Sequence, residues 1–182
     1  MVALIILLGG ARSGKSRLAE GLTQGPGPVT LIATAEGRDS EMRSRILQHQ
    51  RSRPAHWRVV EEPVEMERAL AGVEGDDRII VDCLSLWVSN LMELGLDDSE
   101  IEARARRSAA SAAARGPSTV VVSNEVGSGI VPVNELARRY RDLLGRVNSI
   151  WADAADQVYL AVAGGVVPVQ PARSVWEQAT DA

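Results

Sequence analysis

Residues 9–16 read Gly9-Gly10-Ala11-Arg12-Ser13-Gly14-Lys15-Ser16 and match the phosphate-loop pattern G-x-x-x-x-G-K-[ST] at every fixed position. The apolar run 2–8 precedes them, and residues 17–22 follow with a helical pattern, so the loop joins an expected strand to an expected helix. Glycines let a backbone approach an anion closely, and the start of a helix adds partial positive charge. This context predicts a phosphate-binding loop; an accidental glycine-rich turn is the alternative.

Two residues of the loop carry distinct expected roles. Lys15 would reach the outer phosphates of a nucleotide, and the hydroxyl of Ser16 would ligate Mg²⁺. Asp82 ends an apolar strand pattern, as the acid of a Walker B element does, and is predicted to hold Mg²⁺ or a magnesium-bound water. A turn or helix-capping aspartate is the alternative for Asp82, and Asp153 and Asp156 are weaker candidates for the acid.

Composition sets the class of protein. The chain has 182 residues, of which 45% are hydrophobic and 24% charged, with a net charge of −4. These values suit one catalytic domain, expected over residues 1–170 with a loosely ordered tail at 171–182, and they give no sign of a nucleic-acid partner. The single cysteine, Cys83, excludes an internal disulfide and fits a reducing compartment, so we expect a cytoplasmic protein. The opening apolar run is too short for a membrane span.

Strand and helix patterns alternate along the chain. Strands are expected at 2–8, 29–33, 57–61, 78–83, 119–123, 157–162 and 166–169, with helices in the segments between them. This order predicts an α/β fold of the P-loop NTPase type, with a mainly parallel sheet covered by helices on both faces.

Details of three helices are also expected. The polar helix 41–51 has an apolar face of Met42, Ile46 and Leu47 and would pack lightly at the domain edge. Asp98 or Ser99 would cap the long Ala- and Arg-rich helix that ends near Arg115. A further helix would run from Pro132 to about Ala155, with one apolar stripe formed by Leu136, Tyr140, Leu143, Val147 and Ile150.

His49 is one of only two histidines. A lone histidine on a polar helix is usually a surface residue, but Arg45, Arg51 and Arg53 surround His49 with positive charge suited to phosphates. A neutral imidazole is also a competent nucleophile toward phosphorus. We therefore keep both interpretations for His49 and treat His56 as structural.

Several polar residues follow predicted strands, where ligands gather in open α/β sheets. Thr34-Ala35-Glu36 is one such segment. Glu61 and Glu125 could each accept the paired N1–H and N2–H donors of guanine, and a solvated surface acid is the alternative for both. The glycine-containing loop 124–132 is expected to form a shaped turn that faces a substrate, with a plain structural turn as the alternative.

Together these segments resemble the bifunctional adenosylcobinamide kinase/adenosylcobinamide-phosphate guanylyltransferases of cobalamin biosynthesis. The resemblance covers roughly residues 4–165 and rests on segments 9–17, 32–34, 49–57, 123–132 and 145–148. It implies two reactions: phosphorylation of adenosylcobinamide with ATP or GTP, then transfer of GMP from GTP to the product through a GMP–histidine adduct. His49 matches the adduct position, while relatives with His-His here differ from Gln48-His49 of this chain.

The resemblance also implies nucleotide contacts, Mg²⁺ as cofactor, a corrinoid substrate and a homo-oligomer, specifically a trimer. Trp87, Trp151 and the Ala-rich helix are candidate interface surfaces. The matching nucleotide-contacting positions are Gly9, Gly10, Ala11, Arg12, Ser13, Gly14, Lys15, Ser16, Thr34, Ala35, Glu36, Gln50, Arg51, Ser52, Arg53, Glu61 and Asp82.

Two other functions remain open at this point. One is a kinase of another small metabolite, in which His49 has no catalytic role. If the family resemblance is set aside, the residues themselves favour this kinase. The other is a nucleotide-binding switch without catalysis. Nucleotide binding without turnover would favour the switch.

Overall fold

In the computed structural model, the described residues are 3–25, 27–38, 40–52, 54–116 and 118–170. Within these ranges, seven strands form one sheet in the order β3-β2-β4-β5-β1-β6-β7. The strands are β1 (Leu4–Gly9), β2 (Val29–Ala33), β3 (Arg58–Glu61), β4 (Arg78–Asp82), β5 (Thr119–Val122), β6 (Gln157–Val162) and β7 (Gly165–Pro168). All neighbouring strands are parallel except β6 and β7, which confirms the predicted mainly parallel sheet.

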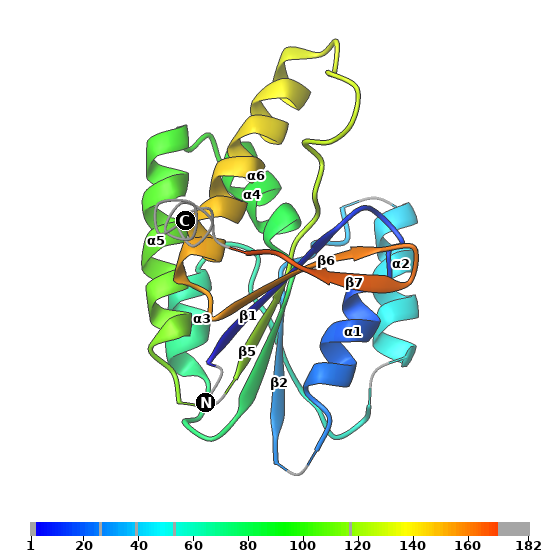
Figure 1. The fold of residues 1–182 in the computed structure, drawn as a ribbon, viewed down its shortest axis with the longest axis vertical. Coiled ribbons are helices and arrows are strands. Elements are labelled where there is room, and N and C mark those ends of the chain that lie inside the picture. Colours follow the sequence, from blue (N-terminus) through cyan, green and yellow to red (C-terminus); the bar gives the residue numbers. More distant parts are fainter. Residues whose placement is uncertain (1–2, 26, 39, 53, 117, 171–182) are drawn as a thin grey trace, which may run out of the picture.

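Helices cover both faces of this sheet (Figure 1). They are α1 (Lys15–Leu22), α2 (Ser40–Ser52), α3 (Met66–Gly72), α4 (Leu84–Glu93), α5 (Asp98–Ala113) and α6 (Glu135–Ala154). Figure 1 shows α3, α4, α5 and α6 together on one side and α1 with α2 on the other. In the described part of the chain, no helix is long and apolar enough to cross a membrane.

The core follows from the two-residue period of the strands. Along β1, Leu4 and Ile6 pack with the helices α3–α6, whereas Ile5 and Leu7 pack on the α1 side. Because successive side chains of a strand point to opposite faces, a strand buried on both sides needs apolar residues at every position. The unbroken apolar run at the start of the chain has this pattern, and its side chains are buried.

Strand register brings the carboxyl ends of three strands to one edge of the sheet. Val122 of β5 is level with Leu7 of β1 and also with Asp82 of β4. The phosphate loop therefore leaves β1 at the same edge where β4 ends in Asp82. Ligands of open α/β sheets bind at this edge.

Helix boundaries differ in part from the expectations. Asp97, rather than Asp98 or Ser99, caps α5, and its carboxylate accepts a hydrogen bond from the Glu100 amide at 2.8 Å. Neighbouring acids have equal capping chemistry, so the sequence could not separate them. Likewise α6 begins at Glu135, after Asn134 as its cap, and not at Pro132.

Two expected apolar positions on helices prove to be exposed. Leu136 is 62% exposed in the first turn of α6 and does not join Leu143 and Val147 in the core. Leu47 of α2 is 52% exposed, while Met42 and Ile46 are partly buried. The polar helix α2 therefore has an even narrower apolar face than predicted.

Trp87 and Trp151 were candidate interface residues, and the structure shows this expectation to be wrong. Both side chains are fully buried within the chain, among the core residues on the α3–α6 face. The Nε1–H of Trp87 donates to the carbonyl of Val64 at 2.8 Å. A tryptophan can fill a core when its N–H finds such a partner.

Asp156, a weaker candidate for the Walker B acid, lies at the opposite edge of the sheet from the phosphate loop. Its Oδ2 accepts hydrogen bonds from the amides of Ala3 at 2.7 Å and Leu4 at 3.0 Å. The bonds from the Leu4 and Ala3 amides lower the pKa of Asp156 below its ordinary value of 3.8. Asp156 therefore ties the start of β1 to the end of α6 and does not serve the nucleotide edge.

We predict that Asp156→Ala lowers Tm at pH 7 by about 2–4 °C, because it removes the two hydrogen bonds to Asp156 Oδ2, which lie near the protein surface and are each weakened by competition with water. A carboxylate with a depressed folded pKa stabilises the fold above its unfolded pKa, and this stabilisation is lost as pH falls through the folded value. The difference in Tm between the wild type and Asp156→Ala should therefore become smaller below pH 3.8. Asp153→Ala, at an exposed position of α6, is the control. Equal Tm losses for both variants at pH 7 would contradict the role of Asp156.

Candidate functional site

A cavity of about 460 Å³ opens at the carboxyl edge of the sheet, where the phosphate loop leaves β1. It is bounded by the phosphate loop, the ends of several strands and one face of α2. The lining residues are Ala11, Arg12, Ser13, Gly14, Lys15, Ser16, Arg17, Ala33, Ala35, Met42, Ile46, Gln50, Glu61, Asp82, Cys83, Leu86, Val122 and Asn124. The volume and the concave shape suit a small-molecule site.

The phosphate loop adopts a backbone that few side chains tolerate. Gly14 precedes α1 with a φ of 93°, in the left-handed region that glycine enters without strain. A Cβ added at Gly9 would lie 2.4 Å from the carbonyl oxygen of Ala161 on β6, and the φ of Gly9 is 153°. The glycines therefore permit both the turn into α1 and the close packing of the loop on its neighbouring strand.

Lys15 lies in the cavity wall and is only 7% exposed. Its Nζ donates to the carbonyl of Gly9 at 2.8 Å, the carbonyl of Gly10 at 2.6 Å and Ser13 Oγ at 3.4 Å. Burial lowers the pKa of Lys15, and the negative charge of Asp82 opposes part of that shift. The ammonium group is thus held inside the loop, in the region where a phosphate would supply a charged acceptor.

Ser16 and Asp82 lie close together, with Ser16 Oγ donating to Asp82 Oδ2 at 3.4 Å. Mg²⁺ prefers oxygen ligands and usually keeps several waters and substrate phosphates in its shell. Among the residues that the structure describes, no group of three His, Cys, Asp or Glu side chains could hold a metal alone. A hydroxyl beside one carboxylate fits Mg²⁺ when a nucleotide supplies the remaining oxygens.

Helix α2 forms the opposite wall of the cavity through Met42, Ile46 and Gln50. A spacing of four residues puts these three side chains on one face of the helix. Glu61, at the end of β3, also lines the cavity. The side chains of His49, Arg51 and Ser52 and all of Arg53 fall outside the described residues, so their predicted roles stay predictions.

Several other predicted contact residues make hydrogen bonds or ion pairs within the protein. The buried hydroxyl of Thr34 donates to the Cys83 carbonyl at 2.7 Å and accepts from the Cys83 amide at 2.8 Å, so it ties β2 to β4. Glu36 pairs with Arg38. Glu125 accepts from the Gly127 amide at 2.5 Å. Gly9, Gly10, Thr34, Glu36 and Glu125 are not among the lining residues, whereas Ala35 is.

The cavity also contains residues that were not predicted individually as nucleotide contacts. Asn124 was expected as part of the loop 124–132 that faces a substrate, and it lines the cavity. Its position directly after a buried strand was the available signal. Cys83 lines the cavity too, but burial raises the pKa of its thiol to about 11, so the thiol stays neutral, in agreement with its expected role in the core.

Comparison with solved structures agrees with the P-loop architecture. A KaiC-like protein from the archaeon Pyrococcus horikoshii OT3 superposes with a TM-score of 0.51, at 15% identity, over 87% of this chain and 70% of that protein. Another protein of the same organism reaches 0.52 at 8% identity, over 92% of this chain and 85% of that one. At these identities the likeness concerns the fold alone.

Sequence relatives are much closer. The bifunctional adenosylcobalamin biosynthesis protein CobP of Pseudomonas aeruginosa is 42% identical over 168 residues, covering 91% of this chain and 96% of the relative. Proteins of the same description named CobU, from Salmonella typhimurium and Escherichia coli, are 43% and 39% identical, and each match covers 88% of this chain and 96% of the relative.

A model of one protein family, described as CobU, cobinamide kinase / cobinamide phosphate guanyltransferase, matches residues 5–169 and so includes the phosphate loop, α2, Asp82 and Asn124. The chain therefore belongs to the cobinamide kinase / cobinamide phosphate guanyltransferase family.

Proposed function

We propose that this chain phosphorylates adenosylcobinamide with ATP or GTP and then transfers GMP from GTP to adenosylcobinamide phosphate, giving adenosylcobinamide-GDP and pyrophosphate. Family membership identifies the two activities. The observation that carries the mechanism is a single cavity bounded by Lys15, Ser16 and Asp82 on one side and by α2 on the other. One nucleotide site then serves both reactions.

For the kinase reaction, the loop amides and Lys15 bind the β- and γ-phosphates and spread the charge that develops during transfer. The acceptor hydroxyl forms a bond to the γ-phosphorus as the bond from that phosphorus to the β-phosphate oxygen breaks. This step releases the nucleoside diphosphate and the hydroxyl proton. Ser16 and Asp82 would hold Mg²⁺, which when bound neutralises phosphate charge and orients the transferring group. Lys15, already held in the loop, exchanges carbonyl acceptors for phosphate oxygens.

For nucleotidyl transfer, an imidazole nitrogen of His49 attacks the α-phosphorus, and the bond to the β-phosphate oxygen breaks to release pyrophosphate. A phosphate oxygen of adenosylcobinamide phosphate then attacks the same phosphorus and frees the imidazole. On a helical period of 3.6 residues, position 49 falls on the same side of α2 as Met42 and Ile46, which line the cavity. This spacing supports His49 as the nucleophile.

Helix α2 is suited to close onto the nucleotide. Leu47 is 52% exposed, and the described polar side chains Arg43, Gln48 and Gln50 are exposed as well. A helix with so little buried apolar surface costs little free energy to displace. Closure would bring His49 to about 3–3.5 Å from the α-phosphorus at attack. Glu61 would accept the guanine N1–H and N2–H donors at the β3 end of the cavity.

His49→Ala should abolish the covalent adduct formed from GTP labelled at the α-phosphate, because the nucleophile is removed, while kinase turnover changes by less than about 3-fold. The measurement is the amount of label that stays on the protein after denaturation. A phosphorus–nitrogen bond to histidine should survive base and be lost in acid. His56→Ala is the control and should label as the wild type does. A wild type that carries no label would contradict the histidine adduct and favour a kinase without nucleotidyl transfer.

Lys15 is the only lysine of the 182-residue chain, so one side chain can be followed by an amine-reactive probe. Because burial lowers its pKa below 10.5, we predict half-maximal labelling of Lys15 at a lower pH than for a free lysine. ATP or GTP should slow the labelling of Lys15 by about 10-fold or more, because bound phosphates cover the amine. The extent of labelling is measured by mass spectrometry of the peptide that contains Lys15. AMP, which lacks the outer phosphates, is the control ligand. Equal labelling with and without GTP would contradict phosphate binding by Lys15.

A homo-oligomer, specifically a trimer, is part of the proposal, as is a cytoplasmic location, consistent with a single buried thiol. The segment before α6 exposes large apolar side chains: Ile130 is 98% exposed and Val133 96%. Exposed apolar clusters of this kind mark interaction surfaces. A second copy of the chain is the partner that we propose for them.

Ile130→Asp combined with Val133→Asp should convert the oligomer to monomer in analytical ultracentrifugation, because two charges would be buried at the interface. Leu94→Asp, at a 59% exposed position beyond α4, is the matched control and should leave the assembly intact. A monomeric wild type, or a double variant that assembles normally, would contradict this part of the proposal.

A further inference from the structure

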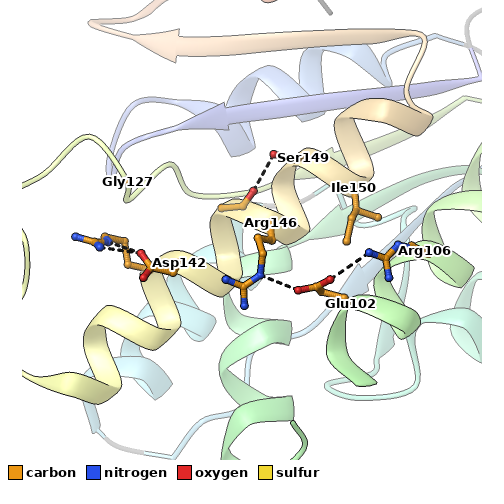
Figure 2. A pocket seen from close by; sticks show the side chains of 9 residues that line it. Glu102, Arg106, Gly127, Asp142, Arg146, Ser149 and Ile150 are labelled. Atoms are coloured by element: carbon orange, nitrogen blue, oxygen red, sulfur yellow. Dashed lines mark hydrogen bonds and ion pairs between the residues drawn. The ribbon is translucent and has the colours of Figure 1, made fainter. Parts of the chain in front are cut away.

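A second cavity, of about 690 Å³, lies where α5, α6 and the loop at Gly127 meet. Its charges are already paired. Figure 2 shows Glu102 between Arg146 and Arg106, from which it accepts at 2.7 Å and 3.1 Å. Asp142 accepts from Arg141. The pair of Glu102 and Arg146 joins α5 to α6, whereas each of the other two pairs lies within one helix. Together these pairs leave little unbalanced charge for a ligand. The unassigned chemistry lies instead in the phosphate-loop cavity.

Asn124 lines that cavity beside Lys15, Ser16 and Asp82, and the two reactions described so far give it no part. Its Nδ2 donates to Ser85 Oγ at 3.1 Å. Within the described residues, no partner is present for its Oδ1, and the second hydrogen on Nδ2 is also available. A side-chain amide has two donor hydrogens and one acceptor oxygen, so Asn124 keeps hydrogen-bonding capacity for a ligand in the cavity that it lines.

The backbone around Asn124 extends the pairing between β5 and β1. The Ser123 amide donates to the Leu7 carbonyl at 2.9 Å, and the Glu125 amide donates to the Gly9 carbonyl at 3.0 Å. The same Gly9 carbonyl accepts from Lys15 Nζ at 2.8 Å. Asn124 is thus fixed relative to the first residue of the phosphate loop and to its lysine.

A buried pair holds this backbone from the α6 side. Asn148 Nδ2 donates to the Asn124 carbonyl at 3.0 Å, and Asn148 Oδ1 accepts from Ser123 Oγ at 2.6 Å. Asn148 is 5% exposed and Ser123 is fully buried. Hydrogen bonds in such surroundings are well shielded from water, so they hold the end of β5 in one geometry.

Sheet order assigns Asn124 to one end of the bound nucleotide. Glu61 ends β3, at one edge strand, whereas β5 lies between β4 and β1, next to Asp82 and the phosphate loop. If Glu61 reads the base, the γ-phosphate lies at the β5 end of the cavity. Asn124 then faces the phosphoryl group that moves in the kinase reaction.

We propose that the Asn124 side chain hydrogen-bonds the γ-phosphate during phosphoryl transfer and that Asn148 is the residue that positions it. This inference rests on the proposed function. The amide neither gains nor loses a proton; it donates to a phosphate oxygen whose charge changes as the bond to the β-phosphate breaks. In nucleotidyl transfer the γ-phosphate leaves within pyrophosphate and is not the reacting group. Asn124 therefore matters more for the kinase reaction than for formation of the histidine adduct.

The test compares both reactions on the same variants. Asn124→Ala should lower kcat for phosphorylation of adenosylcobinamide by about 100-fold, with KM for GTP changed by less than about 3-fold, and should slow adduct formation from α-labelled GTP by less than about 5-fold. Asn148→Ala should produce the same split with a smaller kinase loss of about 10-fold. Asn124→Asp, nearly isosteric with asparagine, places a negative charge beside the γ-phosphate. It should weaken GTP binding in both reactions but lower turnover more in the kinase reaction, where the γ-phosphate is the group transferred.

Asn90→Ala is the matched control for lost stability. Asn90 is also 5% exposed, and its Nδ2 donates to two backbone carbonyls, those of Thr34 at 2.8 Å and Pro63 at 3.1 Å. It should lower Tm without changing the ratio of kinase to adduct rates. The inference would be overturned if Asn124→Ala and Asn124→Asp slowed both reactions equally. It would also be overturned if Asn148→Ala and Asn90→Ala had the same ratio of kinase rate to adduct rate. A wild type that does not phosphorylate adenosylcobinamide would instead refute the proposed function.

Discussion

The pairing of β5 with two neighbours is the constraint on which the nucleotide edge depends. Val122 is level with both Leu7 and Asp82, so the chain that leaves β1 as the phosphate loop emerges beside the acid that ends β4. Parallel strands in register must present their carboxyl ends together, and groups more than 60 residues apart in sequence, such as Ser16 and Asp82, thereby reach 3.4 Å. Neither the loop nor the acid could form this site alone.

The hydrogen bonds of the phosphate-loop lysine are formed before any ligand arrives. The ammonium of Lys15 is bound by the carbonyls of Gly9 and Gly10, and Asp82 contributes negative charge that partly offsets the burial of the amine. A triphosphate brings its own negative charge, so its binding replaces neutral acceptors by charged ones rather than neutralising an isolated cation. The cavity is therefore organised in advance for an anion, which is the condition for electrostatic catalysis.

Much of this arrangement could be predicted from the sequence, since the phosphate loop, the apolar strands and the acid at Asp82 each have a local pattern. Contacts fixed by sheet order were not predictable. Asn124 meets Ser85 and Asn148 only because β5 is inserted between β4 and β1, and no local pattern reports that order. Burial of Trp87 and Trp151 was missed for a related reason: an aromatic side chain suits a core or an interface equally well, and only the packing of α4 and α6 decides.

The first glycine of the phosphate loop illustrates how two demands can act on one position. A Cβ at Gly9 would lie 2.4 Å from the Ala161 carbonyl oxygen, a contact made by the sheet and independent of any nucleotide. A descendant protein that lost catalysis, and with it Lys15, would still be obliged to retain glycine at this place. A glycine at this position in a distant homologue can therefore be explained by strand packing alone. It should not be used to infer that the homologue still binds phosphate.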